Sequence, residues 1–439
     1  MKTGAIVSNA DNHVISRPIS NGNRMSLHVI ASGMLGTTFE YYDFVVYGTI
    51  AAIVFNELFF PSASAGFGML LSLATFAIGF LARPLGAAFF GHLGDRIGRR
   101  KTLIFTLVVM GGATVLIGFL PTYSSIGVWA PILLVILRTV QGAAMGGEWG
   151  GAVLLIGEYT NNAKRGYSTS LAQLGSPAGL LLANGVVLSV IAFTTKEQFH
   201  AWGWRIPFLL SFILVLLGLY TRTNVDETPV FKEMQSVKAV ESSPVRETFR
   251  SHGRRLLLAI GATAISFAGY YMFTTMGLAY LSLKHIPSTY GLYGTVIGAA
   301  ISLPTMVLSG IASDRFGRRP LYLLSTVLMA AWALVFFHLL DTGSPVLVAT
   351  SIGVGVVSWS ILWGVQGAFL PEMFPANVRY SAISLAYQIA GALVGLLPVS
   401  ALALYQRFGT SLVLALVTVV IAAISAVAVF FCPETYRSE

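Results

Sequence analysis

The 439-residue sequence contains a single cysteine, Cys432, and few charged residues. One cysteine excludes an intrachain disulfide, and no cluster of Cys and His has the spacing of a zinc site. The sequence also lacks the glycine-rich Walker loop that holds ATP phosphates, so we do not expect ATP to drive its activity. Charged residues make up 10% of the chain, against about a quarter in soluble domains. A soluble globular protein is therefore excluded.

What the chain has instead is long apolar runs. Hydrophobic residues make up 55% of the sequence, and runs of about 20 apolar residues, each long enough to cross a bilayer, recur along its length. Alternating segments of about 10 residues, the pattern of a membrane β-barrel, are absent. We predict an all-α polytopic membrane protein with twelve transmembrane helices near residues 28–55, 66–90, 102–120, 129–156, 166–193, 204–222, 255–282, 291–312, 320–340, 346–370, 380–403 and 410–431.

Lys and Arg are distributed unevenly between the predicted loops. Of the 27, two (Arg83 and Arg138) fall inside apolar runs, four fall on one set of alternate loops, and 21 fall on the opposite set and the tails. This bias is the positive-inside pattern and not a nucleic-acid-binding patch, and it predicts a bacterial inner-membrane protein with both termini in the cytoplasm. We expect a cytoplasmic tail at 1–27, a six-helix bundle at 28–222, a cytoplasmic loop at 223–254, a second six-helix bundle at 255–431 and a cytoplasmic tail at 432–439.

One loop sequence occurs twice, about half a chain length apart. GHLGDRIGRR at 91–100 returns as GIASDRFGRR at 310–319, and a second repeat matches a Glu and an Arg, seven positions apart, in each half. Such offsets indicate two homologous halves. A loop of this kind can pair its carboxylate with a guanidinium, turn tightly at its glycines and stay on one side of the bilayer. We predict a conformational gate formed by Gly91, Asp95, Arg96, Gly98, Arg99, Glu158, Arg165, Asp314, Arg315, Gly317, Arg318, Glu372 and Arg379.

These features resemble the major facilitator superfamily, in which twelve spans form two halves and a loop like DRIGRR (95–100) follows the second span. EYYDFVVYG at 40–48, ARPLG at 82–86, RTVQG at 138–142 and GGEWGG at 146–151 resemble more narrowly its metabolite:proton symporter branch. The sequence is more similar to the shikimate-transporter-like members than to the proline/betaine members. The resemblance implies a proton-coupled importer of small organic acids or zwitterions that works by alternating access.

Charged residues inside predicted spans need a reason, because a charge at membrane depth is costly. Glu40 and Asp43 share one face of the first span, and Arg138 and Glu148 share one face of the fourth. Arg138 and Glu148 are about 15 Å apart along the helix axis, so they cannot pair, and Asp43 is the better match for Arg138 in depth. We hypothesise that Asp43 carries the coupled proton, with Glu40 and Glu148 as further candidates, and that Arg138 binds a substrate carboxylate. The alternative for each charged residue is a structural ion pair.

The second half offers no charge at matching depth in its first or fourth span. It offers aromatic and amide side chains, which can line a pocket for a small polar molecule, although plain packing is the alternative for each of them. Together with polar residues of the first half, the predicted substrate-binding set is Arg138, Gln141, Tyr42, Tyr47, Gln173, Tyr270, Trp359, Trp363 and Gln366.

Our first functional hypothesis is proton-driven import of a small organic acid or zwitterion. The second is a proton antiporter that exports a drug or antibiotic. A membrane-embedded enzyme or receptor would need a catalytic cluster or a sizeable soluble domain, and neither is visible, so we do not expect an enzyme. We expect no cofactor apart from protons as the coupling ion, a small-molecule substrate, a lipid bilayer around the protein, no nucleic acid, and no obligate protein partner, so that the protein acts as a monomer.

Overall fold

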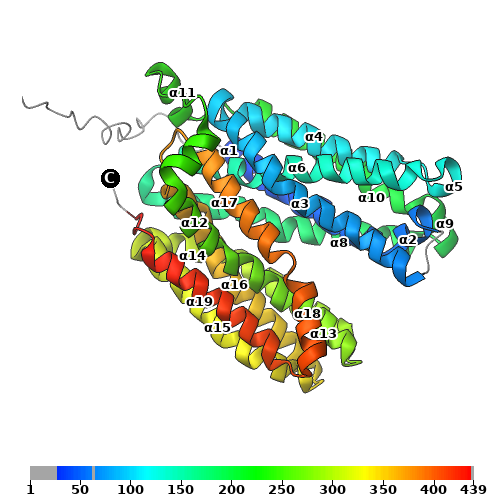
Figure 1. Ribbon diagram of the computed structural model, residues 1–439. Coiled ribbons are helices and arrows are strands. Elements are labelled where there is room, and N and C mark those ends of the chain that lie inside the picture. The colour runs from blue at the N-terminus through cyan, green and yellow to red at the C-terminus, as the bar shows by residue number, and fades with distance from the viewer. Residues whose placement is uncertain (1–26, 62–64, 437–439) are drawn as a thin grey trace, which may run out of the picture.

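The computed structural model describes residues 27–61 and 65–436. These residues form helices and contain no β-strand, which confirms the predicted all-α class. Figure 1 shows two helix bundles, one coloured blue to green and the other green to red, that meet at the end of the molecule that carries α11 (Pro229–Ser236) and diverge towards the other end. We call the end with α11 the closed end and the other the opposite end. The predicted tail at 1–27 lies outside the described residues except for Leu27.

The first bundle is built from residues 27–223. Its long helices alternate in direction between the two ends, and short helices connect them at the opposite end. Its elements are α1 (Leu27–Ile50), η1 (Ala51–Phe55), α2 (Asn56–Phe59), α3 (Ala65–Ile97), α4 (Arg99–Phe119), α5 (Tyr123–Ile126), α6 (Trp129–Glu158), η2 (Asn162–Lys164), α7 (Arg165–Gln173), α8 (Gly175–Phe193), α9 (Lys196–Ala201), η3 (Gly203–Arg205) and α10 (Ile206–Thr223).

The long helices of the second bundle alternate in direction in the same way. Its elements are α12 (Pro244–Tyr271), η4 (Met272–Met276), α13 (Gly277–Leu283), α14 (Ser288–Phe316), α15 (Arg318–Asp341), α16 (Pro345–Glu372), α17 (Arg379–Val394), α18 (Leu397–Phe408) and α19 (Leu412–Phe431). Both η1 and η4 are π-helical. Each follows the first long helix of its bundle, so the repeat extends to this rare local geometry.

Apolar length and small residues explain why these helices form and pack. Ten helical segments of the described chain are long and apolar enough to cross a membrane, and the other two predicted spans correspond to α3 and to the interrupted pair α17–α18. Glycines allow the closest contacts in the first bundle: a Cβ on Gly86 of α3 would collide with the backbone of Ala143 on α6. Small residues of this kind let helix backbones approach closely in lipid.

The polar stretch at 223–254 is largely helical. It contains α11 and the first turns of α12, which begins at Pro244. The backbone of α12 leaves helical geometry at His252 (φ −120°, ψ 15°), close to residue 255, where the sequence predicts the second bundle to start. The extension before His252 is therefore a separate polar segment that continues into the first long helix of the second bundle.

The two bundles pack against each other through a small set of helices. Helix α3 packs on α17, and its counterpart α14 packs on α7; α16 also contacts α7 and α6. These contacts bring together the segments that carry the repeated loop and the start of α7 or α17. The gate predicted from the sequence thus lies at the closed end, between the two bundles.

Candidate functional site

Two aspartates connect the bundles at the closed end. Asp95, near the end of α3, accepts hydrogen bonds of 3.1 and 2.8 Å from backbone N–H groups at the start of α17. Asp314 on α14 accepts two bonds of 2.8 Å from the start of α7. The first N–H groups of a helix have no partner within the helix and lie at the positive end of its dipole, so a carboxylate stabilises them. Each aspartate therefore holds a helix of the other bundle.

Glutamates and arginines extend these contacts, and they pair crosswise. Glu158 lies 3.2 Å from Arg99 of its own bundle and 3.6 Å from Arg379 of the other bundle. Glu372 repeats the arrangement, 3.2 Å from Arg318 of its own bundle and 3.6 Å from Arg165 of the first bundle. Each glutamate thus receives one guanidinium from each bundle, and the pairs connect the residues that the sequence repeat marked.

Two further glutamates, which the sequence analysis missed, cap helices of the closed end. Glu227 accepts N–H bonds of 2.9 and 3.2 Å from the first two residues of α4, and Glu434 accepts bonds of 2.9 and 3.1 Å from the first two residues of α15. Burial raises the pKa of the Glu227 carboxyl, and the bonds that it accepts oppose this shift. Thr228 and Thr435 follow them and donate to the crosswise glutamate of the same bundle, at 2.6 and 2.5 Å. The sequence does contain a signal for these caps, because a Glu-Thr pair follows the last long helix of each half.

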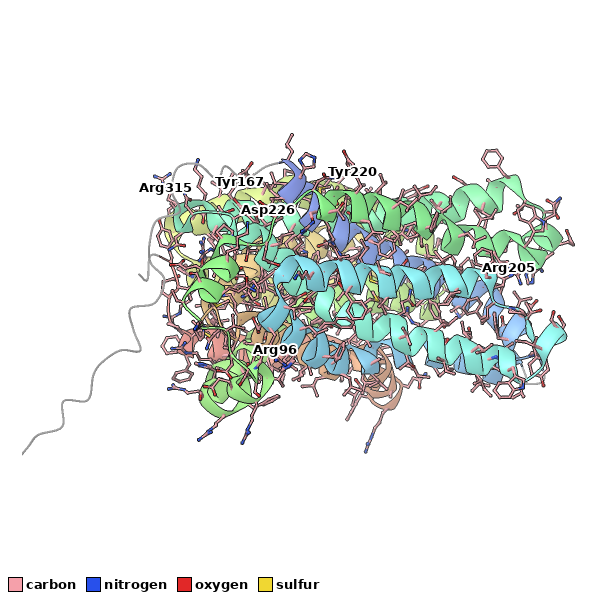
Figure 2. The ribbon with its side chains drawn as sticks, turned by 90° about the horizontal axis from the view of Figure 1, so that it is seen from above. Arg96, Tyr167, Arg205, Tyr220, Asp226 and Arg315 are labelled. Atoms are coloured by element: carbon pink, nitrogen blue, oxygen red, sulfur yellow. The ribbon has the colours of Figure 1, made fainter. Side chains whose placement is uncertain are left out.

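The other predicted gate residues divide into turn glycines and surface cations. Gly98 and Gly317 have φ of 111° and 100°, values that glycine adopts most readily. Gly91 lies against α17, where a Cβ would come within 2.7 Å of the backbone. Arg96 and Arg315 are exposed at the closed end. Figure 2 shows them at one end of the molecule and Arg205, the last residue of η3 between α9 and α10, at the other.

A cavity with about 350 Å³ of empty space lies between the bundles. It is deeper in the molecule than the gate, at the level where both bundles contribute aromatic side chains. Two charged and seven aromatic residues line it, namely Glu40, Tyr41 and Phe44 of α1, Phe80 and Arg83 of α3, Phe267, Tyr270 and Tyr271 of α12, and Tyr387 of α17. Glu40 and Tyr270 belong to the sets predicted from the sequence, whereas Arg83 does not.

The charged wall of this cavity is the ion pair of Glu40 and Arg83. Arg83 Nη1 lies 3.3 Å from Glu40 Oε1, and the two residues are 6% and 3% exposed. The guanidinium lies 4.4 Å from the centroid of the Phe80 ring, and Nη2 is 3.7 Å from the Met145 sulfur. Glu40 Oε2 has no hydrogen-bond partner among residues 27–61 and 65–436. An arginine inside an apolar run was visible in the sequence, but its neighbour was not.

Asp43 lies one helical turn from Glu40 on α1, within the first bundle. Its carboxylate accepts bonds from Thr114 of α4, from Gln141 Nε2 of α6 at 3.2 Å and from Ser211 of α10 at 3.2 Å. The residue is completely buried. A carboxylate that accepts three bonds in this way connects four helices through one charged group.

Gln141 also links Asp43 to Arg138. Its Oε1 accepts a bond of 2.5 Å from Arg138 Nη1. Asp43 and Arg138 therefore lie at similar depth, and the Gln141 amide stands between them. The Arg138 guanidinium lies 4.0 Å from the centroid of the Tyr47 ring. Tyr42 donates to a backbone carbonyl of α10 at 2.8 Å. None of these residues is among those that line the cavity.

Glu148 pairs with Arg222, near the end of α10. Both are buried, and Thr106 donates to Glu148 Oε2 at 2.7 Å. A Cβ on Gly36 of α1 would collide with both members of the pair, so this ion pair is packed directly against α1. In the sequence Arg222 looked like one more loop cation, which is why its role was missed.

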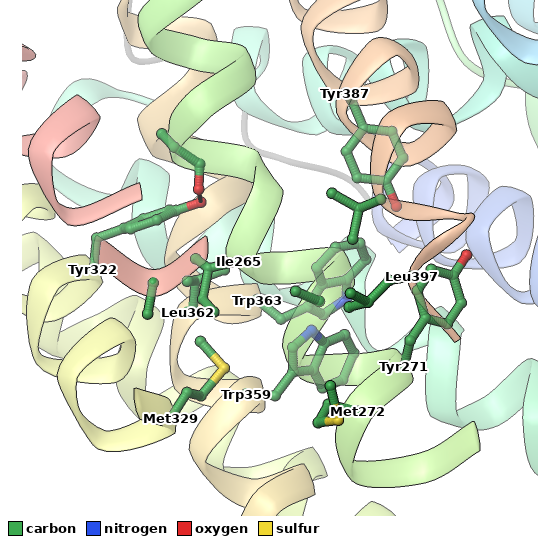
Figure 3. Close-up of a cluster of buried hydrophobic side chains, with 14 of the residues drawn as sticks. Ile265, Tyr271, Met272, Tyr322, Met329, Trp359, Leu362, Trp363, Tyr387 and Leu397 are labelled. Atoms are coloured by element: carbon green, nitrogen blue, oxygen red, sulfur yellow. Dashed lines mark hydrogen bonds between the residues drawn. The ribbon is translucent and has the colours of Figure 1, made fainter. Parts of the chain in front are cut away.

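The aromatic residues predicted in the second half form a stack beside the cavity. The rings of Trp359 and Trp363 are 5.1 Å apart and nearly parallel, and Tyr270 lies 5.2 Å from Trp359; Figure 3 shows the two indoles side by side. Gln173 donates to the Trp363 carbonyl at 3.2 Å and so connects the bundles. Gln366 accepts from a tyrosine inside the second bundle at 3.1 Å. The structure thus brings Tyr270 to the cavity and Gln173 to the interface.

Comparisons with known proteins agree with this architecture. The sequence profile of the family described as "Sugar (and other) transporter" matches residues 29–241 and 230–439. The chain is 39% identical to the inner membrane metabolite transport protein YhjE of Escherichia coli K12 (86% of each chain) and 40% identical to the shikimate transporter of the same organism (82% and 83%). It is 36% identical to OusA, a glycine betaine/proline/ectoine/pipecolic acid transporter of Dickeya dadantii (92% and 83%). The solved structure of the proton:xylose symporter XylE has the same fold, with a TM-score of 0.73 at 21% identity over 93% and 96% of the chains.

Proposed function

Because the chain belongs to the sugar (and other) transporter family of the major facilitator superfamily, we propose that it is a proton-coupled symporter that imports a small organic acid or zwitterionic metabolite across the bacterial inner membrane. Like its relatives, which are transporters, it is a multi-spanning transporter and not an enzyme. The observation that carries the proposal is a charged cavity between the bundles, with a second buried carboxylate one turn away on α1.

The closed end is assigned to the cytoplasm, together with both termini. Among the described residues, the loops and helix ends at this end carry most of the Lys and Arg, as the positive-inside pattern requires. With the closed end inside, the conformation described here faces outward. Import would follow when the contacts of Asp95 and Asp314 with the other bundle break and the bundles rock apart at this end.

Asp43 is assigned as the proton carrier. In the structure its carboxylate is surrounded by three donors, of which Gln141 also contacts Arg138. A proton on Asp43 would replace an acceptor by a donor, so the bonds from Thr114 and Gln141 would have to rearrange. That rearrangement would be transmitted to the pairing of Arg138 and, through α1, to Glu40 at the cavity. Glu148, nearer the closed end, is a candidate for proton release. Transport by this mechanism uses no coupling ion other than protons, and a single copy of the chain is enough to carry it out.

Replacing Asp43 by Asn tests the assignment. In liposomes that contain the purified protein, uptake of radiolabelled shikimate, proline and glycine betaine is measured under an imposed pH gradient and, separately, as exchange between equal pools. Asn cannot take up a proton, so the variant should lose gradient-driven accumulation and keep exchange. Asp226→Asn, which changes a solvent-exposed carboxylate, is the matched control. If Asp43→Asn still concentrates substrate when only a pH difference is imposed, Asp43 is a structural residue.

The direction of flux separates import from the alternative, proton-driven export of a drug. Right-side-out and inverted membrane vesicles are energised with an inward proton gradient. A symporter accumulates its substrate in both preparations, in the same direction as protons. An antiporter moves its substrate against the proton flux, and that result would replace the proposed function with export.

A further inference from the structure

The cavity between the bundles is small and has one carboxylate and one guanidinium. Its empty space of about 350 Å³ includes the part that is open to solvent, so the enclosed part of the cavity is smaller than this. Glu40 and Arg83 lie on its first-bundle side, and aromatic rings of α12 and α17 close the side formed by the second bundle. The occupant must therefore be a compact molecule that meets charges on one side and rings on the other.

Both charged groups of the cavity have bonding capacity that the protein does not use fully. Arg83 meets Glu40 through one nitrogen, at 3.3 Å, while its Nη2 donates to a thioether sulfur at 3.7 Å. Sulfur is a weak acceptor, so a carboxylate would be a better partner for this nitrogen. Glu40 Oε2 is buried and has no hydrogen-bond partner within the described part of the chain. A buried carboxylate oxygen without a partner is costly unless a ligand supplies a donor or a positive charge.

Charge balance then limits the class of ligand. The pair of Glu40 and Arg83 sums to zero, and both residues are almost fully buried. A simple anion would pair with Arg83 and leave Glu40 without a countercharge. A simple cation would pair with Glu40 and leave Arg83 without a countercharge. Either outcome leaves one buried charge unpaired. A molecule with both charges can open the ion pair and give each member a new partner.

The aromatic walls indicate the chemistry of the positive group. Phe267, Tyr270, Tyr271 and Tyr387 line the cavity. A primary ammonium needs three acceptors, which suits a polar pocket, whereas a nitrogen that carries carbon substituents spreads its charge over methyl or methylene groups that pack on ring faces. The cavity wall already holds one cation in this way, since the Arg83 guanidinium lies 4.4 Å from the Phe80 ring centroid.

We propose that this cavity binds a zwitterion whose carboxylate pairs with Arg83 and whose carbon-substituted ammonium lies between Glu40 and the aromatic side chains of α12 and α17. The ligand separates the Glu40–Arg83 ion pair on binding. This inference rests on the proposed function for the identity of the site as the transport site, and it narrows the substrate class from organic acids and zwitterions to alkylated zwitterions.

Equilibrium binding to the purified full-length protein in lipid nanodiscs, without a pH gradient, tests the charge requirement. The probes are glycine betaine, its uncharged-head isostere 3,3-dimethylbutanoate, its carboxylate-free analogue choline, and glycine. Leaving a buried charge without its partner costs a factor of roughly 10 or more in affinity. Glycine betaine should therefore bind at least about tenfold more tightly than 3,3-dimethylbutanoate or choline. It should also bind more tightly than glycine, whose ammonium has no methyl groups to pack on the rings. Equal or weaker binding of glycine betaine than of 3,3-dimethylbutanoate or choline, or no binding of glycine betaine at all, would overturn the proposal.

Two variants turn the same argument into a change of preference, which misfolding cannot imitate. Glu40→Gln leaves Arg83 without a countercharge, so 3,3-dimethylbutanoate should become the tightest of the four ligands. Arg83→Gln leaves Glu40 without a countercharge, so choline should become the tightest-binding of the four ligands. Glu57→Gln, at an exposed position of α2, should keep the wild-type order. If neither variant changes the order, the Glu40–Arg83 pair does not recognise the ligand charges and the proposal fails.

The two proposals fail separately. Binding experiments contain no gradient and report only on the cavity, whereas accumulation under a pH gradient reports on coupling. If glycine betaine binds with the expected preferences but is not accumulated by an imposed pH difference, the zwitterion site stands and proton symport falls. If accumulation of an organic acid is found with no preference for zwitterions, symport stands and the zwitterion site falls.

Discussion

Replacing Asp95 by Asn should favour opening of the closed end. Asp95 accepts two backbone N–H bonds from α17 and lies 3.5 Å from Arg99. Asn keeps one acceptor oxygen, turns an amide donor towards the N–H groups and loses the charge, so about one charge-assisted hydrogen bond between the bundles is lost. Such a bond contributes about 1.5–3 kcal/mol. We therefore expect the equilibrium between the outward-facing and inward-facing conformations to shift by about 2 kcal/mol, or roughly 30-fold, towards the inward-facing one.

Distances between spin labels on the two bundles measure this shift. In a variant without the native cysteine, one label pair is placed at exposed Lys101 of α4 and Ser251 of α12, at the closed end, and another at exposed Thr195 and Thr289, at the opposite end. Asp95→Asn should lengthen the first distance and shorten the second in a growing fraction of molecules. Both changes are needed, because rocking opens one end as it closes the other.

The control and the binding measurement decide the interpretation. Asp226→Asn removes a carboxylate that is 83% exposed and contacts Lys232 within its own loop, so it should leave both distance distributions unchanged. Substrate affinity of Asp95→Asn should stay within a few-fold of wild type, since the cavity is untouched, while transport falls strongly. Unchanged distances together with lost binding would refute the role of Asp95 as a contact between the bundles.

Two more tests address topology and helix capping. In a variant whose native cysteine is replaced by serine, single cysteines at Ser236 and Thr195 should react from opposite sides of the membrane with an impermeant reagent; labelling of position 236 in intact cells would overturn the orientation. Glu434→Gln should lower the unfolding free energy by about 1–2 kcal/mol because it removes the charged cap of α15. Thermal unfolding in detergent measures this loss, and Asp226→Asn, at an exposed position outside the helices, should show none; equal stability of the two variants would mean that the cap is not needed.

Much of the fold followed from the sequence because bilayer thickness and the repeat constrain it strongly. A run of apolar residues must span the hydrocarbon as a helix, and the repeated loop fixed the two halves. Pro398 indicates the break between α17 and α18 at 395–396, but the π-helices after α1 and α12 could not be predicted. They depend on which neighbours replace the lost backbone bonds, and single-sequence periodicity does not contain that information.

The candidate site was predicted less completely, and for a related reason. A helical wheel tells which residues share a face of a helix, and Glu40 and Asp43 do lie one turn apart on α1. It does not tell which helices that face meets, and the two residues have different neighbours. Arg83 therefore remained a cation in an apolar run until the structure placed it 3.3 Å from Glu40. The same holds for Arg222. Its position in the sequence suggests a loop cation, but in the structure it is buried and paired with Glu148. Pairing between helices is a tertiary property.

The capping glutamates also set an order on biosynthesis. Glu227 follows the last helix of the first bundle, so the carboxylate that caps α4 exists before the second bundle has been made. Glu434 follows α19, so α15 enters the membrane with its first N–H groups uncapped and waits for the last helix of its bundle. A chain interrupted between these points has one finished bundle and one that lacks its closing contact. Quality control in the membrane, by insertases or proteases, therefore has a defined interval in which to act on the second bundle alone.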